Sequence, residues 1–425
     1  MFLNLTLLCL YIFTLFYAVQ AVKYFSPVRG YHSLFYCFLF AQSLYVITPM
    51  FDNIVGTVEY KFINELVLYS IISTIFLSLG GFAFSYKYKD NTNPIAPNIY
   101  IEKFKNYDGA NKILFYSLVV GLTSACLYLF ALYQVLGLDP VKWFGTYLRF
   151  ETGEGSGNFG KEQAWLMGAI STPAILIYLL KDKNIIFSST FLIPFIIIVF
   201  SLIVRGNRNY LMLVLMPIIV IYLIKKGYLK TNFVILFFLV FIFSGQLIDI
   251  LRAAGLYSVF TGEQINPAVW SMGLSVGEFG STIRSFEFYL SNGFKFDLLL
   301  GKSYLLDPIL NMATTLGFPF EVLSYKLAVA MSARGQLFGF GFSHQLESIL
   351  NFGFIGGPLV YFFFGFFLKY IDSIKTDNIF TFILSLYLLP IIINLQRIDF
   401  AVAVKLATIP IFFLMLIIGL SRIKL

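Results

Sequence analysis

The chain has 425 residues, of which 59% are hydrophobic and 12% are charged. A soluble domain has about 25% charged residues, so this composition excludes a soluble globular protein and indicates a polytopic membrane protein. The net charge of +8 is spread over many short connections, which favours a membrane-orientation signal over a nucleic-acid-binding surface. The three cysteines lie in apolar runs without the spacing of a metal site: Cys9, Cys37 and Cys126.

Apolar runs of about 20 residues, the length needed to cross a bilayer, recur along the chain. We expect an all-α membrane protein with about 11 transmembrane helices, near 2–21, 32–51, 65–86, 113–137, 164–180, 185–204, 209–224, 231–248, 352–371, 378–396 and 399–421. The first run lacks both a basic segment before it and a small-residue cleavage site after it, which predicts a retained span. We therefore expect one integral membrane domain over residues 1–425.

The distribution of Lys and Arg predicts which connections face the cytoplasm. The odd-numbered connections and the C-terminal tail hold 16 of these residues, whereas the short even-numbered connections hold 7. Because basic residues accumulate in cytoplasmic loops, we expect the N-terminus outside and the C-terminus in the cytoplasm. The long connection 249–351 then lies outside, and its mixture of apolar stripes and single charges predicts short helices along the membrane surface.

A polar turn at 201–210 (SLIVRGNRNY) separates two apolar runs and holds Arg205 and Arg208. Both lie on the side where basic residues are depleted, just before the start of the next span. A helix N-terminus beside two guanidinium groups is suited to an anion, and arginine matches phosphate in a bidentate manner. The alternative is that the two arginines only flank the membrane interface.

A second polar stretch is FGFGFSHQLESILNFGFIGGP, at 338–358. Ser343 is suited to capping a helix, and His344 and Glu347 are three residues apart, so they share a helical face. One of only two histidines in the chain thus lies beside a glutamate on the predicted outer face, which makes the pair a functional candidate. The alternative is a polar helix start at the membrane surface. The glycines that follow are predicted to allow close backbone packing: Gly353, Gly356 and Gly357.

A third stretch, LQRIDFAVAVK at 395–405, precedes and opens the last span. Arg397 and Asp399 are expected to cap that helix, and Lys405 lies about 9 Å deeper. An intramembrane lysine on an apolar helix is a functional candidate, although it can also pair with an acid such as Asp249. Three weaker candidates add to the charge of the outer face and are each typical of a solvated loop: Glu278, Arg284 and Arg334.

Several catalytic signatures are missing from the sequence. It has no GxxxxGK[ST] phosphate loop, no DxD or HExxH motif and no Cys/His pairing, so neither a metal nor another cofactor is expected. It also lacks a GxSxG motif, which leaves a hydrolase nucleophile elbow unsupported.

Three local patterns resemble the Wzy-type polymerases of O-antigen and oligosaccharide repeat units. They are the arginine-rich turn that opens a mid-chain span (RGNRNYLMLVL), the GFS..LES.LNFG..GG stretch, and the isolated arginine before the last span (LQRIDF). Overall length, span number and one long external loop also agree. The resemblance implies a C-type glycosyltransferase-like membrane fold in the bacterial inner membrane. It also implies an active site on the periplasmic side and, as a partner, a chain-length-regulating co-polymerase.

The resemblance further implies transfer of a growing glycan from undecaprenyl diphosphate to the non-reducing end of a lipid-linked repeat unit. The departing diphosphate needs cations where charge develops, and the acceptor hydroxyl needs a base. We expect Arg205, Arg208 and Arg397 to bind the diphosphate. Further substrate-binding candidates are Arg284, Arg334 and Glu278, with Lys405 at the lipid phosphate and His344 or Glu347 as the base. The arginines are scattered singly here, whereas the family is described around arginine-rich motifs in two external loops.

Three alternatives to a polymerase remain. An O-antigen ligase-like glycosyltransferase would share the fold and most charged residues. A lipid-linked oligosaccharide flippase or another transporter belongs to a different class, but transporters often show repeated halves, and this sequence has no visible repeat. A non-catalytic scaffold is the third.

Overall fold

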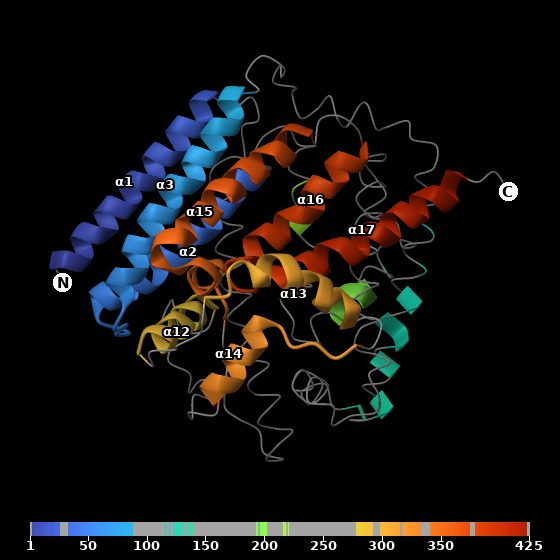
Figure 1. Ribbon diagram of the computed structural model, residues 1–425. Helices are drawn as coiled ribbons and strands as arrows, with labels where there is room; N and C mark the ends of the chain where they lie inside the picture. Colours follow the sequence, from blue (N-terminus) through green and yellow to red (C-terminus); the bar gives the residue numbers. More distant parts are fainter. Residues whose placement is uncertain are drawn as a thin grey trace. The chain divides into compact units, whose positions relative to one another are not determined.

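The structure is a computed structural model of the whole chain (Figure 1). It describes residues 2–25, 33–87, 278–291, 298–314, 318–332, 341–374 and 379–422, with scattered positions between 115 and 220. The chain forms two compact units, of which the first comprises Met1–Ile95 and Met272–Ala407 and the second Ala96–Ser271 and Thr408–Leu425. Every contact discussed below lies within the first unit.

All regular elements in the described ranges are α-helices, and no strand occurs there. They are α1 (Phe2–Phe25), α2 (Leu34–Val55), α3 (Ile63–Lys87), α12 (Glu278–Ser291), α13 (Lys302–Ala313), α14 (Leu323–Ser332), α15 (His344–Ile374), α16 (Ile379–Asn394) and α17 (Phe400–Arg422). Four of them, α1, α2, α3 and α15, are long and apolar enough to cross a membrane. The predicted helical membrane protein is thus confirmed, while the total of about 11 spans stays a prediction, because the spans expected between 113 and 248 lie mostly outside the described residues.

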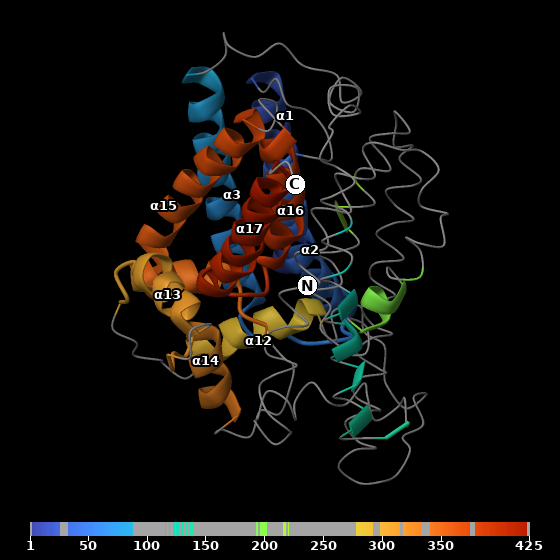
Figure 2. The same cartoon turned by 90° about the vertical axis from the view of Figure 1, so that its right-hand side faces the viewer.

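The centre of the first unit is the contact between α3 and α15, which lie side by side in both views (Figures 1 and 2). Glycines let the two backbones approach closely. A Cβ on Gly80 of α3 would overlap the carbonyl oxygen of Phe362, and a Cβ on Gly365 of α15 would overlap the carbonyl oxygen of Leu77. Small residues at a helix interface serve this purpose in membrane proteins, where close packing replaces the hydrophobic driving force.

One end of this bundle gathers the short helices α12, α13 and α14, together with the starts of α15 and α17 (Figures 1 and 2). Glu287 of α12 accepts hydrogen bonds from the backbone amides of Lys61 and Phe62, in the turn before α3. The α2–α3 turn, the helices of 278–332 and the 395–399 turn therefore lie at the same end. We call this the α13 end. The charge distribution had predicted one membrane side for these connections, and that side itself stays a prediction.

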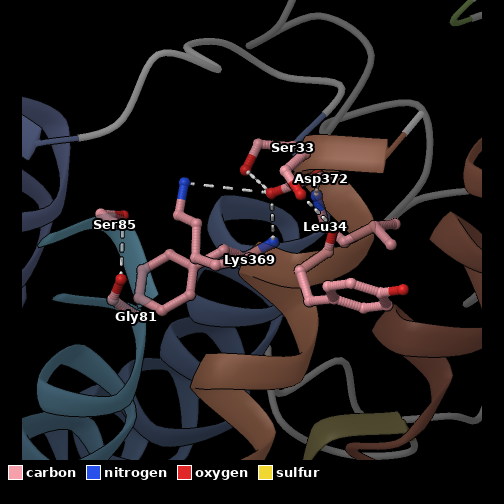
Figure 3. A network of polar contacts seen from close by, with 9 residues as sticks. Ser33, Leu34, Gly81, Ser85, Lys369 and Asp372 are labelled. Carbon is pink, nitrogen blue, oxygen red and sulfur yellow. Dashed lines mark hydrogen bonds and ion pairs between the residues drawn. The ribbon is translucent and has the colours of Figure 1, made fainter. Parts of the chain in front are cut away.

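At the opposite end, Asp372 near the end of α15 caps the start of α2 (Figure 3). One carboxylate oxygen accepts from the Leu34 amide at 2.9 Å, and the other accepts from the Ser33 hydroxyl at 2.5 Å. The second oxygen also lies 3.9 Å from the ammonium of Lys369, which sits over the Tyr36 ring at 4.8 Å from its centre. Lys369 and Asp372 are 2% and 1% exposed, so a buried ion pair lies at this end.

Candidate functional site

The element that organises the α13 end is a break in α15. Gly353 has φ 71° and ψ 179°, so the helix consists of a short polar segment, 344–352, followed by a longer apolar one. A break leaves carbonyl oxygens without their intrahelical donors. Here the Leu350 carbonyl accepts from the Leu299 amide at 3.1 Å, and the Asn351 carbonyl accepts from the Leu300 amide at 3.0 Å. The segment before α13 therefore completes the end of the polar segment.

The turn into α13 is tight. Leu300 has φ 47° and Gly301 has φ 86°, so two successive residues adopt the left-handed conformation. For a residue with a Cβ, such as Leu300, that conformation costs roughly 1–2 kcal/mol. The turn places Ser303, in the first turn of α13, directly against α15. The local strain is thus offset by contacts that α13 makes with the polar segment.

Glu347 connects three helices from a fully buried position. Its Oε1 accepts from the Ser303 hydroxyl of α13 at 2.6 Å, and its Oε2 accepts from the backbone amide of Phe400, the first residue of α17, at 2.8 Å. Asn351 donates to the same Ser303 hydroxyl at 2.7 Å. A carboxylate is favourable at the positive end of a helix, so Glu347 both stabilises the start of α17 and holds α13 in place.

Asp399 caps α17, as the sequence predicted. Its Oδ1 accepts from the Val402 amide at 2.8 Å, which is the usual N-cap contact. Its Oδ2 accepts from both the hydroxyl and the amide of Ser324, in the first turn of α14, at 2.6 and 3.1 Å. The carboxylates of Asp399 and Glu347 therefore bind α13, α14 and α15 to one helix start.

Lys405 lies in the second turn of α17 and is partly buried. Its ammonium donates to the hydroxyl of Thr314 at the end of α13, at 2.7 Å. The Asn311 side chain donates to the Ala401 carbonyl at 3.1 Å, so the C-terminal half of α13 also lies against α17. The alternative partner of Lys405, Asp249, lies outside the described residues.

Arg397 lies in the turn between α16 and α17 and is partly exposed. Its carbonyl accepts from the Phe342 amide at 2.8 Å, and the Leu395 carbonyl accepts from the His344 amide at 3.1 Å. Ser343 caps α15 through the Leu346 amide at 3.1 Å, as predicted. The starts of α15 and α17 are thus adjacent, and Arg397 stands beside both.

His344 is fully enclosed by aromatic rings. Ring centres lie 5.2 Å away for Tyr361 and Phe364, 5.7 Å for Tyr304 of α13, and 6.1 Å for Phe38 of α2. Among the described residues, neither ring nitrogen has a hydrogen-bond partner. The imidazole therefore lies inside the helix junction in this arrangement, with Tyr304 covering it from α13.

Charges at the α13 end are segregated by depth. The carboxylates of Glu347, Asp399 and Asp307 are at most 7% exposed. Basic side chains face outward instead, with Lys61, Arg284, Lys302 and Lys326 exposed and Arg397 and Lys405 partly exposed. The acidic side chains described at this surface are fewer, with Glu59, Glu65 and Glu321 exposed and Glu287 partly exposed. Among the described side chains, the surface of this end therefore carries an excess of basic over acidic groups, while Glu347, Asp399 and Asp307 are buried beneath it.

The sequence-predicted site residues divide into two groups. Arg397, Lys405, His344 and Glu347 lie together at the junction of α13, α15 and α17, and Arg284 lies exposed on α12 at the same end. The others lie outside the described side chains: Arg205, Arg208, Arg334 and Glu278, the last of which begins α12. Sequence reasoning missed Ser303, Ser324 and Asn311, whose roles depend on contacts between distant segments.

Comparison with known families decides the identity. The family model of the O-antigen polysaccharide polymerase Wzy matches residues 1–424. The chain belongs to the Wzy family. The Wzy family comprises multi-pass membrane proteins that polymerise O-antigen repeat units, so this is a glycosyltransferase-like polymerase acting on lipid-linked repeat units. Comparisons with curated proteins and with solved structures gave no match.

Proposed function

We propose that this Wzy-family protein transfers a growing glycan from undecaprenyl diphosphate to the non-reducing end of a second lipid-linked repeat unit. In this step the bond between the sugar anomeric carbon and the diphosphate oxygen breaks. A new glycosidic bond forms to the acceptor hydroxyl, whose proton passes to a base. The observation that carries the proposal is the cationic surface of the α13 end, beside the junction that holds Glu347.

Guanidinium and ammonium groups would stabilise the leaving diphosphate. Charge develops on its oxygen as the bond breaks, and fixed cations placed there lower the barrier. Arg397 is our principal candidate, because it stands beside two helix starts, and Lys405 lies in the second turn of α17. We assign supporting roles to Arg205, Arg208, Arg284 and Arg334. With these groups in place the transfer is proposed to proceed without a metal.

We propose His344 or Glu347 as the base and Glu278 as a further substrate contact. Both candidates for the base are enclosed, so proton transfer requires the acceptor hydroxyl to reach Glu347 in place of Ser303, or His344 in place of Tyr304. Glu347 has a second role that needs no such exchange, since it already fixes α13 and the start of α17. A base must accept a proton, whereas a positioning residue must only keep its hydrogen bonds, so mutation of Glu347 can distinguish the two roles.

The proposed location follows the predicted orientation. We place the protein in the bacterial inner membrane with its N-terminus outside, its C-terminus in the cytoplasm and the α13 end on the periplasmic side. The gathering of 278–332, the α2–α3 turn and Arg397 at one end supports a shared side for these segments. A chain-length-regulating co-polymerase is the proposed partner.

An assay with purified components tests the function. The protein in detergent, supplied with one lipid-linked repeat unit and no nucleotide, should give a ladder of longer lipid-linked glycans on a gel. A chelator should leave the ladder unchanged. Transfer of glycan to lipid A core with no ladder would instead indicate a ligase, and the absence of both products would contradict the proposal.

A further inference from the structure

The helix α13 has its polar and apolar faces arranged inversely to a helix on a soluble protein. The side chains of Ser303, Asp307 and Asn311, four residues apart, are buried against the neighbouring helices. Leu305 and Ile309 on the other face are 75% and 61% exposed. A surface helix in water has the opposite arrangement. The outward face of α13 therefore requires a hydrocarbon environment.

Apolar side chains are also exposed where α13 meets α15 and along α15 itself. Leu300, just before α13, is 76% exposed. A Cβ on Gly301 would lie 3.2 Å from the Phe352 ring, at the break of α15. Beyond the break, Ile355, Leu359 and Phe363 recur every four residues, so they form one face of the apolar segment. We name the combined surface the apolar strip: Leu300, Leu305, Ile309, Ile355, Leu359 and Phe363.

The exposure of these α15 side chains is high, at 94% for Ile355, 52% for Leu359 and 69% for Phe363. The segment belongs to a candidate membrane span, so the part of the apolar strip that lies on α15 faces the bilayer. The other part of the strip lies on α13, which is too short to be a span. The strip thus leads from the membrane interior to the level of the short helices.

A basic side chain lies at the α13 end of the apolar strip. Lys302 is exposed and lies between Leu300 and Leu305 in the sequence, in the first turn of α13. A long apolar surface with a cation at its head is complementary to an amphiphile that carries phosphate on a hydrocarbon chain. The inner face of the same helix holds Ser303 against Glu347. A lipid phosphate beside Lys302 would therefore lie next in sequence to Ser303, whose hydroxyl donates to Glu347 on the inner side of α13.

We propose that the apolar strip seats the isoprenoid chain of the lipid-linked repeat unit, with Lys302 beside its phosphates. The inference rests on the proposed function and specifies which surface binds the lipid part of that substrate. Ordinary bilayer lipid on the same surface is the competing occupant.

Truncation of the strip separates these occupants. Leu305→Ala and Ile355→Ala remove apolar contact from the strip, and Leu10→Ala and Ile12→Ala remove the same groups from α1, where they are 46% and 49% exposed. Each strip variant should raise KM for an undecaprenyl-linked repeat unit by about fivefold to tenfold, with kcat retained. With a geranyl-linked repeat unit, which cannot span the strip, KM should stay within about twofold of the wild type. The α1 variants should match the wild type with both substrates. Equal effects at the two positions, or equal losses with the two substrates, would overturn the proposal.

A binding measurement makes the test independent of turnover. A photoreactive phenylalanine analogue is placed at position 305 in one variant and at position 10 in another, and each protein is irradiated with an undecaprenyl diphosphate-linked repeat unit in detergent–phospholipid micelles. We expect substrate adducts at position 305 that excess unlabelled substrate abolishes, and phospholipid adducts at position 10. Adducts at 305 that the excess does not reduce would show bulk lipid alone. A wild-type protein that gives no ladder would contradict the proposed function, while the adduct at 305 would still decide where the lipid binds.

Discussion

The two ends of the first unit use carboxylates differently. Asp372 caps α2 at one end, and Glu347 and Asp399 stabilise the start of α17 at the other. Asp372 lies 3.9 Å from the buried ammonium of Lys369, so the cation is inside the protein with it. At the α13 end Glu347 and Asp399 accept from hydroxyls and backbone amides, and the neighbouring basic side chains reach the surface.

The difference has a physical consequence. A buried ion pair holds two helices together but presents no charge to a ligand, because the two opposite charges neutralise each other inside the protein. Carboxylates that are satisfied by neutral donors leave the surface with a cationic excess. The first arrangement is suited to holding the ends of α2 and α15 together, and the second is suited to binding an anionic substrate. Mutations at the end that holds the ion pair should therefore lower stability, whereas mutations of basic residues at the α13 end should lower turnover.

The largest effect on stability is expected at the end that holds the ion pair of Asp372 and Lys369. Asp372→Ala removes the cap of α2 and leaves the ammonium of Lys369 buried without its carboxylate, which should lower the free energy of unfolding by about 3–5 kcal/mol. Thermal unfolding of the detergent-purified protein measures this. The double variant Asp372→Ala with Lys369→Met no longer buries a charge and should recover part of the loss. Equal stability of the single and double variants would contradict an important role for the ion pair.

At the α13 end, Arg397→Ala should affect turnover more than folding. Removing one cation that stabilises a leaving group costs about 2.7–4 kcal/mol of transition-state stabilisation, a loss of about 10²-fold to 10³-fold in kcat. The rate of ladder formation gives this value, and the melting temperature should change little. Lys61→Ala removes another basic side chain from the same surface, away from the starts of α15 and α17, and should lower kcat far less; Lys61 is exposed and lies over the Phe62 ring. A normal ladder from Arg397→Ala would remove Arg397 from the site.

Glu347 distinguishes a positioning role from a base. Glu347→Ala leaves the Ser303 hydroxyl and the Phe400 amide without their acceptor and should cost about 2 kcal/mol of stability. Glu347→Gln can still accept from Phe400 through its carbonyl oxygen and can donate to Ser303 through its amide. If Glu347 positions the helices, the Gln variant keeps both stability and ladder. Loss of the ladder at normal stability would identify Glu347 as the base.

The same comparison applies to His344. His344→Phe fills the aromatic enclosure with a ring of similar shape and removes two buried nitrogens that have no partner among the described residues. The variant should therefore fold at least as well as the wild type. Retained turnover would leave His344 a structural role, and loss of turnover in the folded variant would support it as the base.

The smallest effect concerns pH and α12. Burial raises the pKa of Glu287 above its ordinary value of 4.5, while the hydrogen bonds from the Lys61 and Phe62 amides oppose the shift. The folded state therefore disfavours the charged form, and its stability falls as pH rises through the range above 4.5. Glu287→Gln keeps an acceptor oxygen without the charge. At pH 7 it should exceed the wild type by less than about 0.5 kcal/mol, since solvent screens this half-exposed group, and the two should converge below pH 4.5. A difference in melting temperature that grows on acidification would contradict this sign.

Features that depend on neighbouring residues were predictable from the sequence. The apolar runs gave α1, α2 and α3 within a few residues, and the caps Ser343 and Asp399 are local to their helices. The break at Gly353 was not predicted, because it is stable only where Leu299 and Leu300 supply donors from a distant segment. The glycines after 352 were expected to allow close backbone packing; a Cβ on Gly357 would overlap the side-chain hydroxyl of Tyr69, whereas the overlap with the backbone of α3 occurs at Gly365.

The candidate site was predictable in its composition but not in its connections. The charged residues Arg397, Lys405 and Glu347 were identified from their chemistry and position along the chain. Their partners Ser303 and Thr314 are ordinary hydroxyl residues in a long connection, and no local pattern distinguishes them. Burial of His344 also depends on rings from α2 and α13, which the sequence of α15 does not reveal.

The glycine contact between α3 and α15 imposes an order on biogenesis. The ribosome completes α3 near the beginning of translation and α15 near the end, so the glycine face of α3 must enter the membrane long before its permanent neighbour exists. Only after α15 has been inserted can Glu347 meet α13, and α17 must follow before the carboxylate finds the Phe400 amide. A chain that ends before α17 therefore lacks the Phe400 amide that donates to Glu347 and the Val402 amide that donates to Asp399.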